Sequence, residues 1–389
     1  MSKERIGSLD FLRGLAVLGM LVANVPWHVG DSMSRVHDPD WSSVTAWILQ
    51  YSIFDQRFMP IFAMLFGASL YLLVGTSSKS SAFDRYFLRR MGILLGLGLA
   101  HAYLLWPGDI LITYAVCGPF LLLAFRHHAW TLVGLGLALN ALNLAFGEWP
   151  GLYERTIERV LFSWWVDYGE APSTIAEAYA GSYSDLLQYN AWRNQFIQWT
   201  ALPYFRVWNA LGLMLIGMGL FRLGVLQGNR PKDFYKKLLA VSISISIPLV
   251  TYGVFARIGR HDAVGSYLGF IGDLPLENIT FRSGCAVMSL GIIAAVHLVY
   301  DRLAKRVRAP VEAVGRMALT NYLLHSVLFL IIMHGFKLIA FDSLDHDHML
   351  ALVFLVWALQ LTWSSPWLSR FRQGPVEALW RRLCGPKPQ

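Results

Sequence analysis

Two residues, one on each side of a predicted chain reversal, are of types that serve in general acid–base catalysis. His101 lies within one apolar run, and Asp109 begins the next run just beyond Pro107-Gly108. Proline and glycine do not continue one helix and favour a tight turn, so a helical hairpin would bring the carboxylate toward the imidazole. A carboxylate-oriented histidine is a pair suited to general-base catalysis, although two helices joined by a buried polar pair would look the same.

Asp10 and Arg13 form a second candidate pair, because residues three apart are neighbours on a helix face. Ionisable groups at membrane depth are costly unless they are paired or face a polar cavity. The spacing therefore predicts either a structural ion pair or a binding site for an anionic headgroup or the phosphates of an acyl-CoA, for which a guanidinium is well suited.

The composition places these residues in a membrane protein. The chain has 389 residues, of which 55% are hydrophobic and 15% are charged, whereas about 25% of residues are charged in soluble domains. Lys and Arg account for the net charge of +8, but they lie in short clusters between apolar runs, so no nucleic-acid partner is expected. The three cysteines are widely spaced, and the acidic and histidine residues near 342–348 read as a polar loop, so no metal or prosthetic group is predicted.

Apolar runs long enough for membrane helices recur along the whole chain. They lie near 11–30, 54–75, 88–106, 108–126, 129–147, 203–226, 237–256, 283–300, 317–336 and 349–368. The sequence predicts an all-α, polytopic transmembrane bundle of about ten spans, a single integral membrane domain over 1–389. Most Lys and Arg lie on the side of the N-terminus, which predicts cytoplasmic termini, and aromatic residues beside charges predict an outer-side interfacial segment at 148–202.

Five ordered stretches resemble the YeiB family of bacterial membrane proteins. They are SLDFLRGLAVLG at 8–19 extending to Asn24, RF and FAMLFGA within 57–68, His101 with WPGDIL up to 111, GRMALTNYLLH at 315–325, and FRQGPVEALWR at 371–381. In this family pattern Arg57 and Arg193 match basic positions. Either could clamp an anionic substrate, or extend to phosphate headgroups at the membrane surface.

The YeiB family is similar in its first span to a wider group of transmembrane acyltransferases, through the Arg-Gly pair at Arg13. In many of those enzymes a catalytic histidine follows eleven positions later, and that position is Asn24 here. Asparagine cannot act as a general base near neutral pH. His28 or His37, in the segment that follows, could replace the missing histidine.

The leading hypothesis is a membrane-embedded acyltransferase of the bacterial inner membrane. It would move an acyl group from a cytoplasmic donor, with acyl-CoA as co-substrate, to an envelope or exported small-molecule or glycan acceptor. His101 would act as base and Asp109 would orient it, and five residues are candidates for substrate binding: Asp10, Arg13, Asn24, Arg57 and Arg193. The alternatives are a transporter or flippase of an amphipathic compound and a noncatalytic membrane assembly factor. The lipid bilayer is the expected surrounding, and a homo-oligomer is left open.

Overall fold

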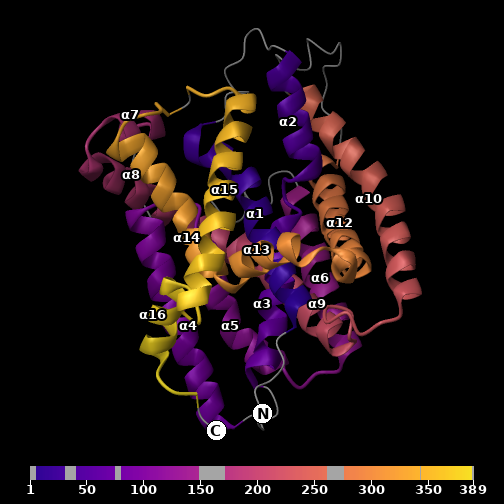
Figure 1. The fold of residues 1–389 in the computed structure, drawn as a ribbon. Coiled ribbons are helices and arrows are strands. Elements are labelled where there is room, and N and C mark those ends of the chain that lie inside the picture. The colour runs from indigo at the N-terminus through magenta and orange to yellow at the C-terminus, as the bar shows by residue number, and fades with distance from the viewer. Residues whose placement is uncertain are drawn as a thin grey trace.

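The computed structural model describes residues 6–30, 41–74, 80–148, 171–260, 276–341 and 343–387, and every regular element among them is a helix (Figure 1). The elements are α1 (Gly7–Val29), α2 (Trp41–Ile53), α3 (Phe58–Val74), α4 (Ser81–Leu104), α5 (Leu111–Ala124), α6 (Ala129–Glu148), α7 (Ile175–Ala180), α8 (Tyr183–Phe196), η3 (Ile197–Arg206), α9 (Val207–Arg222), α10 (Lys232–Arg260), α12 (Glu277–Val299), η4 (Tyr300–Arg302), α13 (Lys305–Arg316), α14 (Ala318–Phe329), η5 (Leu330–Gly335), α15 (His346–Arg370) and α16 (Pro375–Cys384).

These helices confirm the predicted fold class. Each of the ten apolar runs falls on a described helix, and within the described ranges 7 helical stretches are long and apolar enough to cross a membrane. Apolar helices of this kind satisfy their own backbone groups, which is what a lipid environment demands. The chain is therefore a polytopic helical membrane protein, whereas the number of crossings and the side on which the termini lie stay predictions.

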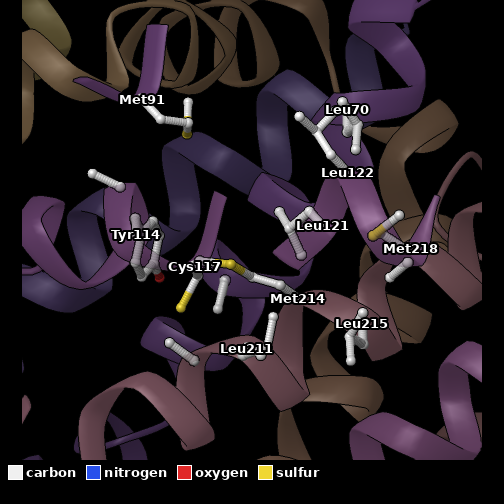
Figure 2. Close-up of a cluster of buried hydrophobic side chains, with 14 of the residues drawn as sticks. Leu70, Met91, Tyr114, Cys117, Leu121, Leu122, Leu211, Met214, Leu215 and Met218 are labelled. Atoms are coloured by element: carbon white, nitrogen blue, oxygen red, sulfur yellow. The ribbon is translucent and has the colours of Figure 1, made fainter. Parts of the chain in front are cut away.

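The centre of the bundle is formed where α3, α5 and α9 pack together. Gly67 of α3 lies directly against the backbone of Met214, and Gly217 of α9 lies against the backbone of Met64, so side chains at the two glycines would hold these helices apart. Figure 2 shows the buried side chains around this crossing, with Cys117 and its neighbours on α5 facing α9. This apolar packing fixes the position of α5, and Asp109 lies two residues before the start of that helix.

Helix α13 packs across the first half of α1, in the middle of the bundle (Figure 1). Gly315 of α13 packs against the carbonyl of Asp10, which leaves no space for a Cβ. On α16, Glu377 Oε1 accepts hydrogen bonds from the backbone N–H groups of Leu319 at 2.8 Å and Thr320 at 3.1 Å. These are among the N–H groups that a helix leaves without intrahelical partners, so α16 caps the start of α14.

The predicted interfacial segment at 148–202 is only partly described. Its residues 149–170 lie outside the described ranges, and α7 is a short surface helix. Tyr183–Arg222, however, is one continuous helical stretch of 40 residues that joins α8, η3 and α9. The second half of the segment is therefore the beginning of a long helix that packs on α4.

Candidate active site

His101 and Asp109 meet at the hairpin between α4 and α5. The helix cannot continue through Pro107, which has no N–H. His101 Nδ1 lies 2.7 Å from Asp109 Oδ2, and Asp109 Oδ1 accepts a hydrogen bond from the N–H of Ile112 at 2.8 Å, which caps α5. Both the imidazole and the carboxylate are only 1% exposed. The predicted contact is present in the structure, while its catalytic role stays a prediction.

A third side chain completes this polar chain of contacts. Ser326 Oγ, on α14, lies 2.9 Å from the other ring nitrogen of His101, Nε2, and the serine is 3% exposed. An ionised carboxylate can only accept, so the proton of the neutral imidazole belongs on Nδ1 beside Asp109. Nε2 is then an acceptor, and the Ser326 hydroxyl donates to it. The result is a buried Asp109–His101–Ser326 chain of hydrogen bonds, called the triad below.

The position of His101 is fixed by α8, which covers the end of α4. The last carbonyls of a helix have no intrahelical partners. Here Asn194 Nδ2 donates to the carbonyl of Ala102 at 2.8 Å, and the Tyr183 hydroxyl donates to that of Leu104 at 2.7 Å. Side chains of α8 therefore bind the free carbonyl groups at the end of α4, the helix that carries the His101 imidazole.

Aromatic rings and two further histidines surround the three residues. The His101 ring is 5.4 Å from that of Tyr322, and His28 stacks between Trp106 at 4.1 Å and Phe329 at 4.7 Å. His325 is 2% exposed and interacts with the side chain of Gln360. The three imidazoles of His28, His101 and His325 lie close enough to interact electrostatically.

Two arginines approach the site from the long helical stretch. Arg206 Nη1 donates to the backbone carbonyl of Asp109 at 3.4 Å, and the charge of Arg193 acts on Arg206. Arg206 ends η3, a π-helical segment that contains Pro203. Because a π-helical turn is wider than an α-helical one, it changes which face a residue occupies, and such turns are frequent at functional sites. One basic side chain, that of Arg206, is thus in contact with the polar site.

The other predicted residues on α1 lie along the same helix, which reaches the site only at His28. Asp10 and Arg13 form the predicted ion pair, with Arg13 Nη1 2.7 Å from Asp10 Oδ1 at the opposite end of α1. Asn24 lies one turn before His28, is half-buried, and makes no side-chain hydrogen bond to a described residue. His37 lies outside the described residues. Of the two substitutes considered for the missing histidine, the structure places His28 beside His101.

Arg57 lies apart from the triad, in the turn between α2 and α3. Its side chain is 0% exposed, and Nη1 donates to the carbonyls of Tyr51, at 2.9 Å, and Asp55. Its guanidinium also lies over the ring of Phe281, at 5.5 Å from the centroid. The carbonyl contacts hold the turn together, and Nη2 is left without a partner among the described residues.

A possible metal-binding cluster lies on the surface, far in sequence from the triad. Asp345, Asp347 and His348 offer ligand atoms within 4.8 Å of one another, and all three are exposed. This group begins α15, where carboxylates are favoured by the helix dipole without any ion. The polar loop expected near 342–348 is therefore partly wrong, because residues 346–348 form the first turn of α15.

Different parts of the chain match two protein families. Residues 220–386 match the family described as "Protein of unknown function (DUF418)", and residues 5–148 match "Heparan-alpha-glucosaminide N-acetyltransferase, catalytic". The chain is 29% identical to the uncharacterized protein YeiB of Escherichia coli (strain K12), over 98% of this chain and 96% of that protein. It is 27% identical to the uncharacterized protein YxaH of Bacillus subtilis (strain 168), over 98% of this chain and 94% of the relative.

Fold and site thus define a multi-pass helical membrane protein with a buried polar centre. The chain is similar over nearly its whole length to YeiB and YxaH, and its second half matches the DUF418 family. Its second similarity, to an acetyltransferase catalytic domain, spans the range that contains His101 and Asp109.

Sequence reasoning missed Ser326 and Arg206. Ser326 follows directly after the family stretch at 315–325, and a scan for hydroxyl groups near that stretch would have marked it. Arg206 has no mark in the sequence beyond its basic side chain.

Proposed function

We propose that this protein is a membrane-embedded acyltransferase, and that His101 is its general base. The observation that carries the proposal is the buried Asp109–His101–Ser326 chain of hydrogen bonds. Support comes from the similarity of residues 5–148 to the catalytic domain of a heparan-alpha-glucosaminide N-acetyltransferase. That protein's name describes transfer of an acetyl group to an amino sugar, so an acetyl or short acyl group is the first candidate cargo.

Different residues of the site have different roles in the proposed acyl transfer. Asp109 holds the proton of His101 on Nδ1, so that Nε2 can accept a proton from an attacking hydroxyl or amine. Arg193 and Arg206 bind an anionic part of one substrate, and burial strengthens these interactions by excluding water. Arg13 and Arg57 remain proposed anion-binding residues at greater distance from His101, and Asn24 a proposed polar contact.

The donor in this proposal is acyl-CoA, reached from the cytoplasm, and the acceptor is a small molecule or glycan on the outer side of the bacterial inner membrane. A thioester fits the apolar, ring-lined surroundings of His101, and the phosphates of coenzyme A fit basic side chains. The proposal needs no metal, because the base and its orienting carboxylate are side chains of the protein itself.

The test is acyl transfer by the purified protein in lipid nanodiscs. Release of free coenzyme A from acetyl-CoA would be followed with a thiol reagent, in the presence of amino sugars and hydroxylated glycans as acceptors. We expect turnover by the wild type, loss of about 10³-fold or more in His101→Gln, and full activity in His127→Gln. His127 is an exposed histidine beyond the far end of α5, so it controls for a generic loss of imidazole. Full activity in His101→Gln would overturn the assignment of the base.

A transporter would give a different result in the same nanodisc and vesicle preparations. Buried ionisable groups such as His101 and Asp109 also occur along transport pathways. Protein-dependent passage of an unmodified compound across vesicles, without coenzyme A release, would favour that function over acyl transfer.

A further inference from the structure

The general-base mechanism proposed above assigns no role to the Ser326 side chain. A serine within a membrane helix usually donates its hydroxyl proton to a carbonyl of the preceding turn. Thr200 and Thr362 do so here, to Phe196 and Ala358. Ser326 instead has its hydrogen bond with His101 Nε2, across 225 positions of sequence. Its hydroxyl is therefore committed to the base rather than to its own helix.

We infer that Ser326 is the nucleophile of this site and carries the acyl group as a covalent ester between donor and acceptor. The inference rests on the proposed acyl transfer and specifies its mechanism. A serine hydroxyl is a weak nucleophile until a neighbouring base takes its proton, and an oriented histidine 2.9 Å away is the required base. Asp109 supplies the orientation through the opposite ring nitrogen.

The reaction then has two balanced halves. Ser326 Oγ attacks the carbonyl carbon of the acyl thioester while its proton passes to His101 Nε2. The C–S bond breaks, the sulfur of coenzyme A takes the proton from His101 and leaves as a thiol, and the acyl group stays on Oγ as an ester. An acceptor hydroxyl or amine next gives its proton to His101 and attacks the ester carbonyl. The C–O bond to Oγ breaks, and Oγ recovers the proton from His101.

Two features of the surroundings agree with a reaction at this serine. The rings of Tyr322 and Trp106, with centroids 5.4 Å and 6.4 Å from that of His101, give the site apolar walls that suit an acyl chain. Ser326 is 3% exposed, so the helices around it must separate for the thioester to enter. The same burial keeps water from the ester, so that the acyl group waits for the acceptor.

The first experiment traps the ester in the absence of an acceptor. Full-length protein in nanodiscs would be mixed with [¹⁴C]acetyl-CoA and quenched in acid, with protein-bound label counted and mapped by mass spectrometry. We expect a burst of free coenzyme A equal in amount to the protein, and label on the peptide that contains Ser326. Ser326→Ala should lose the label and the burst, and so should His101→Gln. Ser364→Ala, which removes a buried serine of α15, should keep both.

A second variant guards against loss of folding in Ser326→Ala. Ser326→Cys should form a thioester in place of the ester, and neutral hydroxylamine should then release the label much faster than from the wild type. Elution as a monodisperse peak on size exclusion would confirm that each variant is folded.

The outcomes separate this mechanism from the broader function. Wild-type rates of acyl transfer in folded Ser326→Ala would overturn the nucleophile and leave the acyltransferase assignment standing. Failure of the wild type to release coenzyme A from any acyl-CoA would overturn the assignment itself. In that case, labelling of Ser326 by a lipophilic fluorophosphonate, which reacts with activated serines, would still support its activation by His101, and absence of that label would overturn it.

Discussion

Replacing Asp109 by asparagine tests the site with the smallest change of shape. Asp109 Oδ1 accepts from the Ile112 N–H at 2.8 Å, and Oδ2 lies 2.7 Å from His101 Nδ1. In Asp109→Asn the amide oxygen can keep the cap on α5, which leaves the NH₂ group facing Nδ1. An NH₂ group donates, so Nδ1 must become the acceptor and the imidazole proton moves to Nε2. The histidine then donates to Ser326 and cannot take its proton.

The expected effect is large on catalysis and small on stability. The corresponding change in a Ser–His–Asp triad lowers kcat by about 10⁴-fold, which is about 5 kcal/mol in the activation free energy. The hydrogen bonds are conserved in number, so the free energy of unfolding should change by less than about 1 kcal/mol. Coenzyme A release and thermal unfolding in nanodiscs would measure the two effects. Activity within about threefold of wild type in Asp109→Asn would refute the tautomer argument.

Three further predictions concern the elements that hold the site. Gly315→Ala should reduce the free energy of unfolding by about 1–3 kcal/mol, because its Cβ overlaps the Asp10 carbonyl. Gly92→Ala has open space inside α4 and should raise the free energy of unfolding by about 0.5–1 kcal/mol through helix propensity. Thermal unfolding of both variants measures the difference. Asn194→Leu should cost about 1–3 kcal/mol, because the Ala102 carbonyl loses its 2.8 Å donor, and an unchanged unfolding temperature would contradict the role given to α8. Glu377→Ala should cost about 1–2 kcal/mol by uncapping α14, with a parallel fall in coenzyme A release that Glu377→Gln partly restores.

Local spacing was enough to predict part of the site. The His101–Asp109 contact follows from the reversal at Pro107-Gly108, because only eight positions separate the two side chains. The Asp10–Arg13 pair follows in the same way from the period of an α-helix. The ten apolar runs likewise predicted the positions of helices, because a helix that crosses a membrane needs a long apolar segment.

Contacts between distant segments could not be predicted in this way. Ser326 meets His101 across 225 positions, and the choice of partner depends on how α14 packs against α4. Arg206 contacts the Asp109 carbonyl from the end of η3, and the apolar pattern of the sequence does not predict that η3 is π-helical. The apolar pattern of one sequence predicts where each helix lies, but it does not predict how one helix is rotated against its neighbour.

The cap that Glu377 places on α14 has a consequence for biosynthesis. Translation produces α4, α5 and α14 well before α16, because Glu377 lies after all of them in the chain. Until α16 has left the ribosome and folded back, the first turn of α14 lacks the carboxylate that binds its N–H groups. The helix that carries Ser326 therefore reaches its full stability only after this late helix is made.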